Sequence, residues 1–197
     1  RGLTNPGHDR WRLRGADGDG PQRAANLDTD LEGVIIRQSV PPTNVEVQAA
    51  IERGMPVLSR ADALASIVAT RRGIGVAGTH GKTTTSSMIT LILRAAGMHP
   101  SFLIGSELNE VGANAGLDRG EWLVVEADES DGTFLELPLE AGLVTNVDND
   151  HLWFWASMER QRGAFGTFGG ASGRRPVRCP RGDFPRETAR HRWGAAP

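Results

Sequence analysis

A glycine-rich loop between a predicted strand and a predicted helix constrains this chain more than any other feature. The loop reads Gly-Thr-His-Gly-Lys-Thr-Thr, and an apolar strand pattern, Gly73–Gly78, leads into it. Glycines let backbone N–H groups approach phosphate oxygens, and the start of the following helix adds positive potential. In such loops the lysine reaches the terminal phosphates of a nucleotide, and the next hydroxyl can hold Mg²⁺. We therefore predict a phosphate-binding site made by Gly78, Thr79, His80, Gly81, Lys82, Thr83 and Thr84.

The loop is a shortened form of the common phosphate-binding pattern. That pattern has a glycine five residues before Gly81, where this chain has Val76. The alternative interpretation is a glycine turn that only begins a helix. Two observations favour the phosphate site: the loop lies at a strand-to-helix junction, and Lys82 is the single lysine among the 22 basic residues of the chain.

Strand and helix patterns alternate along the organised part of the chain, about Leu27 to Phe168. Apolar strand patterns lie at residues 33–39, 55–58, 73–78, 101–105, 122–126 and 141–146. Apolar residues at helical spacing lie at 45–51, 61–68 and 83–96. Strands that alternate with helices predict an α/β fold with a parallel, doubly wound sheet of the P-loop type. In such sheets ligands bind at the carboxyl ends of the strands.

Two polar segments each follow a predicted strand. The first is Glu-Ala-Asp-Glu-Ser-Asp, residues 126–131, in which Glu126 and Asp128 alternate to the same face. Its carboxylates are suited to the metal of a bound nucleotide, although a solvated acidic turn is the alternative. The second, residues 145–151, ends in Asn-Asp-His, so His151 is a candidate metal ligand; the alternative is that Asp150 caps a helix and His151 is exposed.

The three motifs, in this order, resemble the Mur ligases, ATP-dependent amide-forming enzymes of peptidoglycan synthesis. The loop GTHGKTTT and the segment EADESD are most similar to the branch that acts on UDP-N-acetylmuramate and L-alanine, and TNVDNDHL is similar to the family's third motif. The stretch from Ser39 to Leu64 also resembles the end of the family's uridine-binding domain. The resemblance covers about Leu27 to Phe168.

The resemblance implies a two-step reaction with ATP and Mg²⁺ as cofactors. ATP phosphorylates the carboxylate of UDP-N-acetylmuramate, and the amino group of L-alanine then displaces phosphate from the acyl phosphate. Lys82, Glu126 and His151 are the implied catalytic residues. Thr83 and Glu126 would hold the Mg²⁺ of the nucleotide, and His151 a second Mg²⁺. Three alternatives stay open: a tripeptide-recycling muramate ligase, a folylpolyglutamate synthase, and a P-loop ATP-binding module without ligase activity.

The resemblance also suggests a domain organisation. Residues 1–26 are an unassigned head, and 27–70 are a remnant of a Rossmann-like, uridine-nucleotide-binding N-terminal domain. Residues 71–168 are part of a central ATP-binding domain, and 169–197 are an arginine-rich tail that we expect to be disordered. Head and tail lack family motifs, so we expect out-of-frame translation at both ends and no ligase activity from this polypeptide alone. In the third motif, Trp153 stands where the family has aspartate.

Composition narrows the setting. The chain has 197 residues, 39% of them hydrophobic, and one cysteine, Cys179, which predicts no internal disulfide and fits a reducing, cytoplasmic location. No apolar run approaches the roughly 18–20 residues of a membrane span, and the start of the chain has no signal-peptide pattern, so we expect no membrane partner. The basic tail could bind nucleic acid, but we favour a solvated terminus and predict no nucleic-acid partner.

Overall fold

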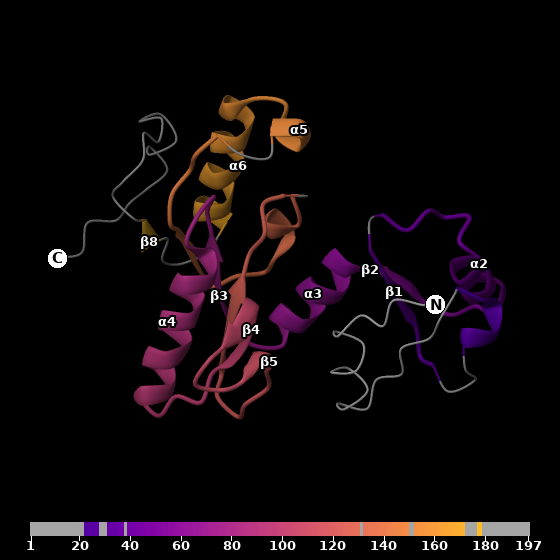
Figure 1. Cartoon of the computed structure of the whole chain (residues 1–197), viewed down its shortest axis with the longest axis horizontal. Coiled ribbons are helices and arrows are strands. Elements are labelled where there is room, and N and C mark those ends of the chain that lie inside the picture. Colours follow the sequence, from indigo (N-terminus) through magenta and orange to yellow (C-terminus); the bar gives the residue numbers. More distant parts are fainter. Residues whose placement is uncertain are drawn as a thin grey trace, which may run out of the picture. The chain divides into compact units, whose positions relative to one another are not determined.

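The structure, a computed structural model, describes residues 22–27, 31–37, 39–130, 132–149, 152–171 and 177–178. The chain divides into two compact units, Arg1–Ala63 and Leu64–Pro197. The division falls within helix α3, Arg60–Ala69 (Figure 1). The domain boundary expected from the sequence lies between residues 70 and 71 and stays a prediction.

The first unit contains two short parallel strands, β1 (Val34–Ile36) and β2 (Val57–Ser59). The 3-10 turn η1 (Ala24–Asn26) and helix α2 (Val45–Glu52) accompany them. Asn44 caps α2: its side-chain oxygen accepts hydrogen bonds from the N–H groups of the second and third helical residues. A small core packs between α2 and the strands, formed by Leu27, Val34, Ala49, Ala50, Met55 and Val57.

The second unit is built on a six-stranded sheet in the order β5-β4-β6-β3-β7-β8. Its strands are β3 (Arg72–Ala77), β4 (Ser101–Leu108), β5 (Ala113–Gly116), β6 (Trp122–Glu126), β7 (Ala141–Val144) and β8 (Val177–Arg178). Its helical elements are α4 (Lys82–Ala95), η2 (Thr133–Glu136), α5 (Leu152–Trp155) and α6 (Met158–Ala171). Neighbouring strands run parallel except β4 and β5, which are antiparallel. The predicted α/β fold is therefore confirmed, with one antiparallel strand added at an edge.

Both faces of this sheet are covered, as a doubly wound fold requires. Alternate residues of β6 point to opposite sides: Val124 joins a cluster with α4, whereas Leu123 and Val125 join a cluster with η2 and α6. Figure 1 shows α4 lying along the sheet, and α6 covering the part near β7. The larger cluster includes a group of aromatic rings in which Phe134 lies against Trp155, Phe165 and Phe168.

Several elements were not predicted from the sequence, among them β5, α5, α6 and β8. Strand β5 was not predicted, because its sequence Ala-Asn-Ala-Gly carries no apolar alternation. Helix α6 was not predicted and enters the arginine-rich tail as far as Ala171, and β8 pairs with β7 within that tail, where no strand was expected. The other tail residues lie outside the described part of the chain. Among the helices that the structure describes, none has the length and apolarity needed to cross a membrane.

Candidate functional site: a phosphate cradle

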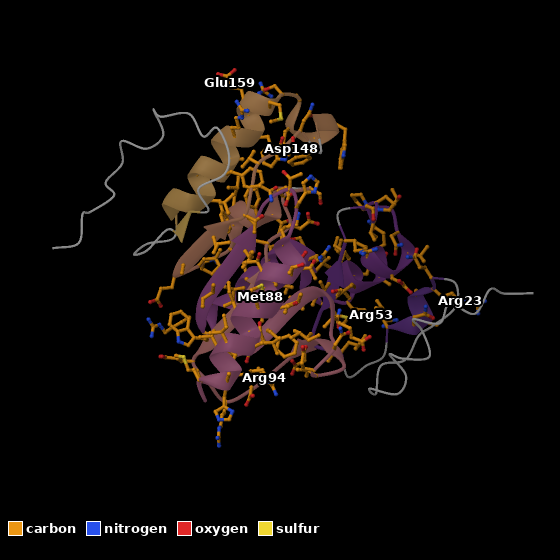
Figure 2. The ribbon with its side chains drawn as sticks, turned by 60° about the vertical axis from the view of Figure 1, so that its left-hand side comes forward. Arg23, Arg53, Met88, Arg94, Asp148 and Glu159 are labelled. Atoms are coloured by element: carbon orange, nitrogen blue, oxygen red, sulfur yellow. The ribbon has the colours of Figure 1, made fainter. Side chains whose placement is uncertain are left out.

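The predicted loop lies at the carboxyl end of β3 and at the start of α4. Strand β3 is flanked by β6 and β7 in parallel, so the residues after all three strands meet at one edge of the sheet. Figure 2 shows this polarity, with Asp148, after β7, at one end of the unit and Arg94, near the end of α4, at the other. The three sequence motifs therefore converge at the edge where doubly wound sheets bind ligands.

Two glycines give the loop its shape. Gly78 has φ 131° and Gly81 has φ 81°, values in the left-handed region that side chains disfavour. At Gly78 a Cβ atom would also lie 2.9 Å from the backbone carbonyl oxygen of Asn146 and 3.0 Å from the backbone nitrogen of the same residue. The loop is thus tight, with the backbone of the segment after β7 against it.

That segment holds the loop through hydrogen bonds. The Asn146 side-chain oxygen accepts from the His80 N–H (2.9 Å), and its Nδ2 donates to the His80 carbonyl (2.8 Å). The Thr145 hydroxyl donates to the same carbonyl at 2.7 Å. Thr79 donates its N–H to the Asn146 carbonyl, and its hydroxyl accepts from the Asp148 N–H at 2.9 Å. The backbone of Thr79 and His80 is therefore set by residues more than 60 positions later in the chain.

Lys82 forms a buried ion pair with Glu129. Its Nζ lies 2.9 and 2.8 Å from the two carboxylate oxygens and donates to the Gly78 carbonyl at 2.7 Å. The Lys82 side chain is 14% exposed and that of Glu129 is 0% exposed. The indole N–H of Trp155, on α5, donates to the Glu129 carbonyl at 3.1 Å and so ties the acidic segment to the segment after the third motif.

Thr83 and Glu126 form a second, more open pair. The Thr83 hydroxyl donates to Glu126 Oε1 at 3.1 Å, and the Gly105 N–H donates to Oε2 at 2.7 Å. In an octahedral Mg²⁺ site with bonds of 2.0–2.1 Å, adjacent oxygens lie about 2.9 Å apart. The separation of the Thr83 and Glu126 oxygens fits this spacing, and a hydroxyl with a carboxylate is a donor set that Mg²⁺ accepts.

Four other residues named in the sequence analysis have exposed side chains. His80 is exposed, with its Nε2 3.8 Å from Asp148 Oδ2. Thr84 is exposed on the first turn of α4. Asp128 is exposed and accepts hydrogen bonds from Ser130, so it does not share the position of Glu126. Trp153 is 77% exposed. His151 lies outside the described residues.

Sequence reasoning missed three residues of this site. Glu129 was included in the acidic segment but not singled out, because the sequence alone does not show that this glutamate is buried against Lys82. Gly105 was taken only as the end of a strand, although a Cβ there would lie 2.9 Å from Glu126 Oε2. Asn146 was likewise placed in a strand end. A polar residue directly after a buried parallel strand is the one signal that points to it.

Comparisons with known proteins agree with the three motifs. The model of the Mur ligase middle domain matches residues 76–169, and the model described as the Mur ligase family, catalytic domain, matches residues 5–72. The second match includes most of residues 1–26, for which no family motif was found in the sequence analysis.

Curated relatives give closer matches. The UDP-N-acetylmuramate--L-alanine ligase of Pelotomaculum thermopropionicum is 50% identical over 139 residues, 71% of this chain and 30% of that protein. That of Acidothermus cellulolyticus is 51% identical over 140 residues, 71% of this chain and 29% of that protein. The chain thus spans about 30% of the length of these relatives.

Solved structures share the fold. UDP-N-acetylmuramate:L-alanyl-gamma-D-glutamyl-meso-diaminopimelate ligase from Neisseria meningitides has a TM-score of 0.81 and 26% identity, over 95% of this chain and 64% of that one. UDP-N-acetylmuramate-alanine ligase from Thermotoga maritima has a TM-score of 0.74 and 27% identity, over 83% and 38% of the two chains. The motifs, the cradle they build and both domain matches lead to one conclusion: the chain belongs to the Mur ligase family.

Proposed function

We propose that this protein is an ATP-dependent ligase that joins L-alanine to the carboxylate of UDP-N-acetylmuramate. The observation that carries the proposal is the arrangement around α4: a glycine cradle with Lys82 beside it and the Thr83–Glu126 pair next to it. The curated relatives named for this reaction, at 50% and 51% identity, support the substrate assignment. Because the chain spans about 30% of their length, it would supply only part of the complete site.

The chain's residues would act mainly by positioning charge. The loop N–H groups and the start of α4 would bind the phosphates of ATP, and Lys82 would neutralise charge on the transferred phosphoryl group. Thr83 and Glu126 would hold a Mg²⁺ ion, which would neutralise phosphate charge when bound. A muramate carboxylate oxygen would attack the terminal phosphorus and ADP would leave. The alanine nitrogen would then attack the acyl carbon, lose a proton and expel inorganic phosphate. A second Mg²⁺ at His151 rests on the family resemblance, as does a cytoplasmic setting.

A second candidate is a ligase that attaches a peptide to UDP-N-acetylmuramate. It is favoured by one observation, the TM-score of 0.81 with the Neisseria ligase named for a tripeptide. Both candidates use the same cradle chemistry, so the cradle does not separate them. They differ in the amine that completes the reaction.

The nucleotide half of the proposal can be tested on the chain as it stands. Calorimetric titration with a non-hydrolysable ATP analogue and Mg²⁺ should show one binding site, and Lys82→Ala should remove it. Lys82→Arg should not restore it, because the planar guanidinium cannot take the place of a compact ammonium. Absence of binding to the unaltered chain would refute the proposal.

The ligase half calls for a chimera. Residues 76–169 would replace the corresponding segment of the Pelotomaculum ligase, and phosphate release would be measured with ATP and UDP-N-acetylmuramate. Release that depends on an added amine supports ligase chemistry by residues 76–169; because the rest of the chimera comes from a UDP-N-acetylmuramate--L-alanine ligase, this measurement tests the reaction type and does not separate the two candidates. The same chimera with Lys82→Ala is the matched control. Phosphate release without any amine would leave only a P-loop ATPase.

A further inference from the structure

The buried pair of Lys82 and Glu129 uses every donor of the lysine. An ammonium has three N–H donors and no acceptor. The three acceptors around Lys82 Nζ are Glu129 Oε1, Glu129 Oε2 and the Gly78 carbonyl, at 2.9, 2.8 and 2.7 Å. In this arrangement no donor of Lys82 is left over for a phosphate oxygen.

Glu129 is held firmly where it meets the lysine. Its side chain is 0% exposed, and Trp155 donates to its backbone carbonyl at 3.1 Å. Two residues earlier, the Ala127 N–H donates to the Val76 carbonyl at the end of β3, which fixes the segment to the central strand. Because the Glu129 carboxylate is buried, it cannot rotate into solvent when an anion binds, so it stays next to Lys82.

We propose that Glu129 is a positioning residue that competes with nucleotide phosphates for Lys82. In the empty cradle it aligns the ammonium against the loop. When a phosphate enters, at least one N–H of Lys82 exchanges its acceptor, a Glu129 oxygen, for a phosphate oxygen. The inference rests on the proposed binding of ATP phosphates by the cradle, and it assigns to Glu129 a role separate from the metal-binding role of Glu126.

The competition predicts an unusual direction of effect. Glu129→Gln keeps the size of the side chain but removes its charge and one of its two acceptors for Lys82. A hydrogen bond from Lys82 to a neutral amide is weaker than one to a carboxylate, so less free energy is lost when a Lys82 N–H turns from residue 129 to a phosphate oxygen. Binding of a non-hydrolysable Mg·ATP analogue should therefore tighten roughly tenfold. Asp128→Asn is the matched control: it removes one charge from the same segment, but that side chain is exposed and bonded to Ser130. It should change affinity less than about twofold.

A spectroscopic readout isolates the lysine itself. Lys82 is the only lysine of the chain, so lysine-specific ¹⁵N labelling gives one side-chain ammonium signal. In the unaltered chain this signal should shift when the Mg·ATP analogue saturates the site. In Glu129→Gln it should be displaced before any nucleotide is added. A general change in packing would not tighten binding and displace this signal together.

The outcomes separate the two proposals. Weaker or unchanged affinity in Glu129→Gln, or equal tightening in Asp128→Asn, would overturn the role of Glu129 while leaving nucleotide binding intact. Lack of binding in the unaltered chain would overturn the proposed function and, with it, the competition. If Glu129→Gln does not fold, the unaltered chain still decides: a Lys82 signal that saturating nucleotide leaves unmoved would show that no acceptor is exchanged.

Discussion

Two carboxylates of one acidic segment, Glu126 and Glu129, meet neighbouring residues of α4 in contrasting surroundings. Glu129 is fully buried and pairs with Lys82 through both oxygens. Glu126 is half-buried, and its oxygens accept from the Thr83 hydroxyl and the Gly105 N–H, which carry no formal charge. Burial makes the loss of either partner of the first pair costly, because the remaining charge would be left uncompensated, whereas the second pair keeps its charge available for a cation. Proximity in sequence therefore does not make the two carboxylates equivalent.

Removing the cation of the buried pair should have the largest effect. Lys82→Met leaves the Glu129 carboxylate buried opposite an apolar chain, and uncompensated buried charges of this kind cost about 3–5 kcal/mol. We expect a loss of that size in the free energy of unfolding, measured by urea titration, together with loss of nucleotide binding. A stability within about 0.5 kcal/mol of the unaltered chain would show that the pair does not support the fold.

Neutralising the open pair should affect ligand binding and spare the fold. Glu126→Gln should reduce the Mg²⁺-dependent part of nucleotide affinity by about 100-fold, since loss of even an outer partner of a metal ligand costs about 10–100-fold. Its urea midpoint should stay close to that of the unaltered chain, because Glu126 is half-buried. The measurement is nucleotide affinity with and without Mg²⁺; equal losses in both conditions would argue against a metal ligand.

Gly105→Ala tests whether the backbone orients Glu126. The new Cβ would lie 2.9 and 3.0 Å from the two Glu126 oxygens, so the carboxylate must turn away from Thr83. Mg²⁺-dependent affinity should fall about tenfold. The effect should vanish in a Glu126→Ala background, where no carboxylate is left to displace. Additive losses in the double variant would contradict this route.

The smallest effect on stability is expected at the hydrogen bond from the Trp155 indole to the Glu129 backbone carbonyl. Trp155→Phe keeps an aromatic ring against Phe134 but removes the indole donor to the Glu129 carbonyl. The free energy of unfolding should fall by about 1 kcal/mol, the usual net value of one hydrogen bond. Trp153→Phe, at an exposed site nearby, is the control and should change it less.

The two pairs also differ in how much of each could be predicted from the sequence. Gly78–Thr84 was predicted because strand, glycines, lysine and helix are consecutive, so local pattern is enough. Glu126 was predicted because it ends a strand at the ligand-binding edge. The partner of Glu129 could not be predicted, because it depends on how α4 packs on the sheet, which no local period encodes. Strand β5 was missed because Ala-Asn-Ala-Gly has no apolar alternation: its residues pair with β4 by position rather than by propensity.

The strand order has a consequence for the time at which the cradle can form. Strand β3 pairs only with β6 and β7, both made later, and Asn146 fixes the backbone of Thr79 and His80. Sixty-six residues separate Asn146 from His80. At a synthesis rate of about 5–20 residues per second, the loop would be present for roughly 3–13 seconds before the residue that shapes it exists. During that interval the loop glycines are free to sample other conformations, so competence to bind phosphate arises only after β7 and Asn146 have been made and the central strand gains its second neighbour.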